Sequence, residues 1–360
     1  MLIVTNRLLD AQFSDENALT RAYAPFAPTL NFAQVTGSAA NSPVWRVSSP
    51  ASAVTDKKAM DVLMAHFQGS NPVLVYVHGN NNTPADCFAR CKALEDQYGL
   101  AVVGYSWTSE GYQPDGSELA GIDSRKLATD ADEDSLAHVT KAKLDEGWIQ
   151  RKARRYAQAK VNAQHSTASL ARFFRLVAAA RLATMTQPYS VALHSLGCHF
   201  LHYAIQQDGA AESIAVAQNV ALMAGCTGAD KHAAWVGQLN PVRRVYVIYT
   251  KADSVLAAAT VIDGDAKLGT NPGEERLAGP KYRYVDFAGA AKMKLGAHRY
   301  FVADPGKSLS QAAAKLFQRV FSSQEDFSAG ETPKVVYPVG CSADGSVCYM
   351  GNSATPDGGP

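Results

Sequence analysis

The segment Tyr189-Ser-Val-Ala-Leu-His194-Ser195-Leu196-Gly197 joins a strand to the start of a helix. Residues 189–194 form a run typical of a buried strand, and a helix is expected from about residue 196 to residue 207. Ser195 would then lie in the tight turn between the two. Such a turn puts a serine hydroxyl at the carboxyl edge of a sheet, beside the free N–H groups of the first helical turn.

The same alternation of strands and helices continues on both sides of this segment. Thr83 and Pro84 favour a helix start, and Gly99 favours its end near Tyr98. Strands are expected at 2–5, 44–47, 73–77, 100–107, 189–194, 219–224, 244–250 and 283–287, and further helices at 196–207 and 309–321. This order predicts an α/β fold with a mostly parallel, doubly wound sheet flanked by helices.

The composition is that of an ordinary globular protein: hydrophobic residues make up 47% of the 360 residues and charged residues 19%. The net charge of +1 gives no reason to expect nucleic acid or an anionic membrane as a partner. Residues 1–17 lack the pattern of a secretory signal, and no apolar run approaches the ~20 residues of a membrane span. The default expectation is a cytoplasmic protein, with export by a signal-free secretion machine left open.

Ser195 is the predicted nucleophile, because the strand-to-helix turn has the form of a nucleophile elbow. The turn needs small neighbours, and Gly197 meets that need. Leu193 departs from the usual pattern, which has glycine at that position. The alternative interpretation is an ordinary helix-capping serine.

A nucleophilic serine needs a histidine as its base. The histidines that follow it in the sequence are His199, His202, His232 and His298. The first two stand on the helix after Ser195 and point along it. His298 lies in the loop after the last expected strand, where the base belongs in this fold class, and is therefore the predicted base.

The acid that orients the histidine is expected at the end of the strand that begins at Arg244. Asp253 lies in the loop after that strand and is the predicted acid. Asp230, which follows the preceding strand, is the alternative, and Asp286, inside a strand, is less favoured.

An oxyanion hole requires two backbone N–H donors. Leu196, directly after the serine, should supply one, and Asn80, after the strand that ends in His78-Gly79, should supply the other. Gly79 allows a close approach of the substrate carbonyl. His78 is expected to hold this loop rather than to act in catalysis.

Three motifs resemble a bacterial branch of the α/β-hydrolase superfamily whose function is uncharacterised. They are Val75-Tyr-Val-His-Gly-Asn-Asn-Asn82, the strand end Tyr105-Ser-Trp107 and Ala192-Leu-His-Ser-Leu-Gly-Cys-His199, with further similarity at Val4-Thr-Asn-Arg7. Members of that branch carry an H-G-aromatic-N-N loop, an F-S-W-P-S strand end and an H-S-M-G elbow. The resemblance covers about residues 70–108 and 155–302, and implies the fold and the role of Ser195. Asn80 and Thr108 depart from its pattern.

We expect a hydrolase core at 71–108 and 156–322, preceded by an N-terminal extension with edge strands at 1–70. Residues 323–360, which are rich in Gly, Pro and Ser, are expected to be a loosely ordered tail. Residues 109–155 are expected to be a helical insertion that forms a lid or cap over Ser195, although a surface excursion away from the site is the alternative. Cys341 and Cys348 flank a turn-like sequence, and whether they form a disulfide stays open.

Together these residues predict a serine hydrolase that cleaves a small-molecule or lipid-like carboxylic ester through an acyl-enzyme. One alternative is a hydrolase fold that has lost its activity and serves as a binding module. The other is an acyltransferase, which passes the acyl group to an acceptor other than water. No metal or organic cofactor is expected, since the cysteine spacings match no zinc pattern. The sequence does not predict the oligomeric state.

Overall fold

The computed structural model of the chain describes residues 1–38, 44–52, 55–120, 146–287, 298–303, 309, 311–324, 336–341 and 348–350. Within them an 11-stranded sheet has the order β13-β12-β11-β10-β9-β8-β6-β7-β1-β4-β5, and β2 pairs with β3 in a separate small sheet. The strands are β1 (Leu2–Thr5), β2 (Arg7–Leu9), β3 (Leu19–Tyr23), β4 (Asn31–Ser38), β5 (Val44–Ser52), β6 (Val73–Val77), β7 (Ala101–Ser106), β8 (Tyr189–His194), β9 (Asn219–Met223), β10 (Arg244–Tyr249), β11 (Tyr282–Asp286), β12 (Val336–Cys341) and β13 (Cys348–Met350).

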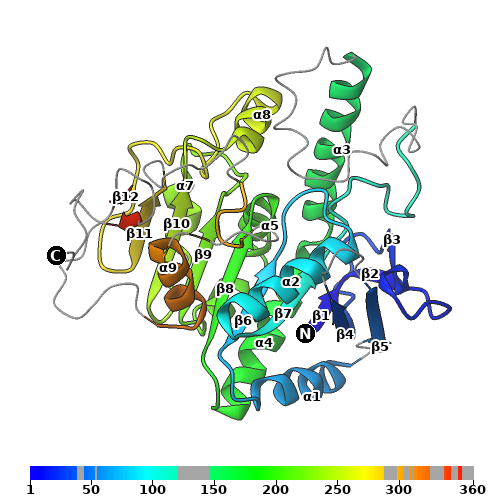
Figure 1. Cartoon of the computed structure of the whole chain (residues 1–360). Coiled ribbons are helices and arrows are strands. Elements are labelled where there is room, and N and C mark those ends of the chain that lie inside the picture. Colours follow the sequence, from blue (N-terminus) through cyan, green and yellow to red (C-terminus); the bar gives the residue numbers. More distant parts are fainter. Residues whose placement is uncertain are drawn as a thin grey trace.

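Neighbouring strands from β12 to β1 run parallel to one another, and antiparallel strands lie only at the two ends of the described sheet. β4 and β5 extend one end and β13 extends the other. The large, mostly parallel sheet flanked by helices (Figure 1) confirms the predicted fold class. β8, whose carboxyl end precedes Ser195, has parallel neighbours on both sides.

Helices cover both faces of the sheet, with α2 and α9 on one face and α4 and α5 on the other (Figure 1). The described helices are η1 (Glu16–Ala18), α1 (Asp56–Phe67), α2 (Pro84–Tyr98), α3 (Glu146–His165), α4 (Thr167–Thr184), α5 (Leu196–Ala204), α6 (Ala210–Ile214), α7 (His232–Val236), α8 (Ser254–Asp263) and α9 (Gln311–Phe321). The cap of α2 follows from its sequence. Thr83 and Asp86 form a capping box, and Gly99 ends the helix with a left-handed φ of 62°.

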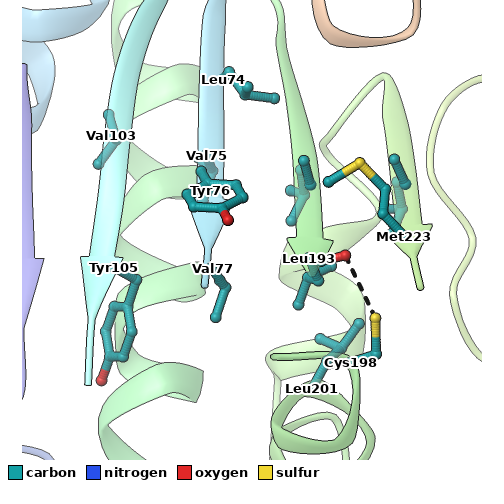
Figure 2. Close-up of a cluster of buried hydrophobic side chains, with 14 of the residues drawn as sticks. Leu74, Val75, Tyr76, Val77, Val103, Tyr105, Leu193, Cys198, Leu201 and Met223 are labelled. Atoms are coloured by element: carbon teal, nitrogen blue, oxygen red, sulfur yellow. Dashed lines mark hydrogen bonds between the residues drawn. The ribbon is translucent and has the colours of Figure 1, made fainter. Parts of the chain in front are cut away.

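The core lies between the sheet and these helices, and it continues up to the turn that carries Ser195. Figure 2 shows side chains of β6, β7, β8 and β9 packed together with Cys198 and Leu201 of α5. The Cys198 thiol donates a hydrogen bond to the carbonyl oxygen of Leu193, at 3.4 Å. The bulky Leu193 is completely buried beside Val77 of the neighbouring strand, so the sheet accommodates this departure from the usual elbow.

The N-terminal region is more regular than the sequence analysis expected. β1 lies inside the sheet between β7 and β4, and the edge position belongs to β5. α1 was not predicted either. It starts at a Thr55 cap and buries Ala59, Leu63 and Phe67, which are spaced four residues apart along one helical face.

The predicted insertion has a described beginning and end. Its first residues contact the N-terminal strands, because the Tyr23 amide donates to the carbonyl of Pro114 at 2.9 Å. At its end, the expected boundary between residues 155 and 156 falls inside the continuous helix α3. Residues 121–145 lie outside the described part of the chain, so the lid stays a prediction.

The predicted tail differs from the expectation at two places, where β12 and β13 extend the sheet. Cys341 and Cys348 are opposite each other in their antiparallel pairing, and the disulfide between them stays a prediction. The cysteines described as free thiols are all buried: Cys87, Cys91, Cys198 and Cys226. None of the helices in the described ranges is long and apolar enough to cross a membrane.

Several histidines of this fold are neutral because they are fully or partly buried: His78 and His199 are buried, and His66 is half-buried. Burial lowers the pKa of His66 in α1 to about 4, and it lowers the pKa values of His78 and His199 to about 3. An unfolded chain takes up these protons near pH 6.5. The stability that the neutral rings contribute is therefore complete above pH ~6.5 and is lost as the pH falls toward their folded pKa values.

We expect the free energy of unfolding to fall between pH 6.5 and pH 4.5, by about 1.4 kcal/mol per pH unit for each such histidine. Urea unfolding at a series of pH values measures this slope. His66 lies in α1, away from Ser195. Replacing His66→Gln should reduce the slope by about 1.4 kcal/mol per pH unit, which corresponds to one proton. An identical slope in the wild type and the variant would contradict the assignment.

Candidate active site

Ser195 has a strained backbone at the junction of β8 and α5. Its φ of 52° and ψ of −120° are unusual for a residue other than glycine. Three backbone hydrogen bonds hold this conformation. The Ser195 amide donates to the carbonyl of Met223 at 2.9 Å, and its carbonyl accepts from the amides of Cys198 (3.0 Å) and Cys226 (2.9 Å). The end of β9 and the loop after it thus fix the turn.

The loop after β6 passes directly beside the start of α5. A Cβ atom at Gly197 would lie 2.8 Å from the carbonyl oxygen of His78 and 2.9 Å from that of Val77. Any side chain at this position would meet rigid backbone. Gly197 is thus needed for the loop that carries Asn80 to approach the helix start that carries Leu196.

Asp253 and His298 form a buried hydrogen-bonded pair. The Nδ1 atom of His298 lies 2.7 Å from Oδ2 of Asp253, and both side chains are completely buried. The other carboxylate oxygen, Oδ1, accepts from the Leu256 amide at 2.9 Å and so caps α8. One aspartate therefore starts a helix and orients the imidazole. Asp230, the alternative acid, is exposed, and Asp286 ends β11.

His194, directly before Ser195, holds the backbone of His298. Its Nε2–H donates to the His298 carbonyl oxygen at 2.9 Å, and the two ring centroids are 4.5 Å apart. Burial is the main cause that lowers the pKa of His194 well below its usual value, and the nearby Arg90 charge adds to it. His194 is thus neutral, with its proton on Nε2. This contact places His298 beside the strand end that carries Ser195.

Tyr300 attaches the same segment to two further strand ends. Its hydroxyl donates to the Ile248 carbonyl of β10 at 2.8 Å and accepts from the Ala224 amide at 2.6 Å. Next to it, the Phe301 carbonyl accepts from the Tyr98 hydroxyl at 2.7 Å. Neither His194 nor Tyr300 was predicted from the sequence, although each lies within two residues of a predicted site residue.

His78 holds the loop after β6, as its expected structural role requires. Its Nδ1–H donates to the Gly79 carbonyl at 2.9 Å, and its Nε2 accepts from the Trp107 amide at 3.1 Å. The Trp107 indole in turn donates to the His78 carbonyl at 3.0 Å, and the two rings are stacked. The two ring nitrogens are thus fully used within the fold.

Three of the four backbone amides from Asn80 to Thr83 donate hydrogen bonds within this part of the chain. The Asn81 amide donates to the Ser109 carbonyl, the Asn82 amide to the Ser109 hydroxyl and the Thr83 amide to Asp86, each at 2.9 Å. Within the described residues the Asn80 amide has no acceptor, and neither does the Leu196 amide in the first turn of α5. Both amides lie on the two segments that meet at Gly197.

The other histidines that follow Ser195 in the sequence are not paired with Asp253. His232 uses both ring nitrogens, on the Ala229 carbonyl and the Tyr284 hydroxyl, at 2.8 Å each. His202 stacks on Trp235. His199 is buried on α5, and burial is the main cause of its low pKa.

A polar cluster beside the elbow was not predicted from the sequence. Asp263 at the end of α8 accepts from the Tyr156 hydroxyl (2.7 Å), Lys160 (3.0 Å) and Lys267 (2.7 Å). Tyr156 also lies 3.3 Å from the sulfur of Cys226, whose amide binds the Ser195 carbonyl. These residues come from distant segments, so no local pattern could have predicted the cluster. No group of three metal-ligating side chains occurs within the parts that the structure describes.

Replacing Tyr300→Phe should lower the free energy of unfolding by about 1–3 kcal/mol, because it removes two buried hydrogen bonds, one to the Ile248 carbonyl and one from the Ala224 amide. The Ala224 amide then keeps only its longer bond, 3.2 Å, to the Ile248 carbonyl. Urea unfolding measures the loss. The matched control is Tyr203→Phe on α5, since the Tyr203 hydroxyl makes no hydrogen bond to the described residues; its effect should stay within about 0.5 kcal/mol. Equal effects of the two changes would contradict the assigned role of Tyr300.

Comparison with known protein families matches residues 56–308 to a family described as an alpha/beta hydrolase of unknown function (DUF900). No curated protein and no solved structure matches the chain. The matched residues include β6 through β11, the turn at Ser195, and both Asp253 and His298. The parallel sheet and the strand-to-helix turn agree with this match, and the chain therefore belongs to this alpha/beta hydrolase family.

Proposed function

We propose that the chain is a serine hydrolase that cleaves carboxylic esters, with Ser195 as nucleophile, His298 as base and Asp253 as the orienting acid. The observation that carries the proposal is the buried 2.7 Å hydrogen bond between His298 and Asp253, on a segment that His194 ties to the strand before Ser195. A histidine ordered by a buried carboxylate, on a segment bonded to the strand that leads into a strained serine turn, supports the activation of that serine hydroxyl.

The protonation of His298 follows from its partner. Because Asp253 is an acceptor, Nδ1 of the neutral ring carries the proton, and Nε2 is the basic nitrogen. In the proposed first step, Nε2 takes the proton of the Ser195 hydroxyl while the oxygen attacks the ester carbonyl. The imidazolium that forms is stabilised by Asp253 and then gives its proton to the departing alcohol.

The tetrahedral intermediate carries a negative charge on the former carbonyl oxygen. The Asn80 and Leu196 amides are the proposed donors to that oxygen, each worth about 3–4 kcal/mol in the transition state. Their hydrogen-bonding capacity is not used within the described chain, whereas the neighbouring loop amides are bonded to Ser109 and Asp86. Water then hydrolyses the acyl-enzyme by the same steps, with His298 again as the base.

Replacing Ser195→Ala or His298→Ala should each lower kcat for p-nitrophenyl acetate by about 10³-fold or more, because the serine and its base act as one unit. Asp253→Asn should also lower kcat strongly, since an amide does not hold the required tautomer of His298. An asparagine still caps α8, so this variant should fold. Circular dichroism and stopped-flow kinetics on the same samples test the set.

The matched control is Asp230→Asn, which changes an exposed aspartate after β9. It should keep wild-type turnover. Wild-type turnover in His298→Ala, or a loss confined to Asp230→Asn, would contradict the assignments. A wild-type chain without any esterase activity would favour the binding module. Transfer of the acyl group to added alcohols, with little free acid formed, would favour the acyltransferase.

A further inference from the structure

Arg7 lies outside the residues matched to the family, yet it reaches the proposed site. It is the first residue of β2 and is completely buried. Its guanidinium makes a bidentate ion pair with Glu110, with NH1 at 3.0 Å from Oε1 and NH2 at 2.7 Å from Oε2. Glu110 is buried as well. A buried ion pair of this kind needs good geometry to offset the loss of hydration.

The same guanidinium bridges the two loops at the carboxyl ends of β6 and β7. Its NH2 group donates to the Trp107 carbonyl at 2.5 Å and, at 3.4 Å, to the Asn82 carbonyl. NH1 also donates to the Thr20 carbonyl at 3.2 Å. One planar group thus fixes the segment after β7 relative to the loop that carries Asn80.

Ser109, the residue before Glu110, connects the ion pair to the loop that carries Asn80. Ser109 accepts the amides of Asn81 and Asn82, and its hydroxyl lies 3.1 Å from the Asn82 carbonyl. The Asn82 side chain then donates to the Asn80 carbonyl at 2.7 Å. The loop is therefore bonded to the Arg7–Glu110 pair on one side. Among the amides of residues 80–83, only that of Asn80 has no acceptor in the described part of the chain.

Stability alone does not explain this arrangement. The Nε–H of Arg7 is buried and has no acceptor among the described residues, which is a cost that an apolar side chain would not carry. Replacing buried ion pairs with apolar residues often leaves a protein equally stable. A rigid fork with donors in fixed directions is, by contrast, well suited to hold two loops and strand β3 in one geometry.

We propose that Arg7, paired with Glu110, is a positioning residue that holds the Asn80 amide in place to stabilise the oxyanion. This inference rests on the proposed ester hydrolysis. Arg7, which precedes the matched residues 56–308, would then contribute to the geometry of the active site. Arg7 does not touch the substrate and acts through Asn82, Ser109 and Trp107.

The test uses Arg7→Lys, which keeps the charge but loses the fork, and Glu110→Gln, which keeps one oxygen acceptor. The control is Glu118→Gln, which breaks the ion pair of Glu118 with Arg155 in the same segment, away from the loop of Asn80. A fluorophosphonate of known concentration counts the reactive sites in each preparation. Turnover of p-nitrophenyl acetate is then expressed per titrated site, so unfolded protein does not enter the comparison.

We expect Arg7→Lys and Glu110→Gln each to lower kcat per titrated site at least tenfold, with KM within twofold of the wild-type value. The inhibition constant of a trifluoromethyl ketone, whose adduct carries an oxyanion, should rise by a similar factor. Turnover and inhibitor binding both depend on the same amide donors. Glu118→Gln should match the wild type in all three measurements.

Unchanged kcat per titrated site in Arg7→Lys and Glu110→Gln would overturn the inference while leaving the proposed function intact. The inference also fails if neither variant yields titratable protein, since the pair would then serve folding itself. A wild-type chain that takes up no fluorophosphonate would overturn the proposed function, and this inference with it.

Discussion

The carbonyl oxygen of His78 lies 2.8 Å from the position that a Cβ atom would occupy at Gly197. This backbone contact brings the loop after β6 against the first turn of α5, and the rest of the proposed site depends on it. Ser195 adopts a φ of 52° at the same junction, a conformation that costs about 1–3 kcal/mol in a residue other than glycine. Hydrogen bonds from the end of β9 and the loop after it hold the serine in that conformation.

The segment of residues 298–303 is attached to several strand ends at once. Asp253 after β10 holds the imidazole of His298, His194 of β8 holds its carbonyl, and Tyr300 binds β9 and β10. A short segment with so many long-range contacts needs little regular structure of its own. The parallel sheet explains why this is possible, because it brings the carboxyl ends of all these strands to one edge.

The opposite side of the site depends on a different set of contacts. Arg7 comes from the N-terminal region, Glu110 from the segment after β7, and the loop of Asn80 from the end of β6. Their ion pair and hydrogen bonds connect regions more than 70 residues apart in sequence. In the proposed mechanism, one set of contacts positions the proton acceptor and the other positions the donors to the oxyanion.

The sequence allowed prediction of the features that depend on local patterns. The strand, turn and helix around Ser195 follow from apolar runs and glycine placement, and the pairing of His298 with Asp253 was expected from their places after successive strands. The contacts of Arg7 and Tyr300 were not predicted, because they are long-range and no spacing in the sequence encodes them.

One element that was not predicted, α1, does have a signal in the sequence. Ala59, Leu63 and Phe67 recur at helical spacing after Thr55, which is a good cap, and together they indicate α1. By contrast, β12 follows a region rich in turn-forming residues, and its pairing with β11 depends on the completed sheet. Tertiary pairing of this kind decides whether a weak strand forms.

In the proposed mechanism, Ser195 carries the activated hydroxyl. Reaction with a fluorophosphonate, followed by intact-mass measurement and peptide mapping, tests it most directly. We expect a single adduct per chain, located on the peptide that contains Ser195 and absent from Ser195→Ala. An adduct on a different residue, or no adduct on the folded wild-type chain, would contradict it.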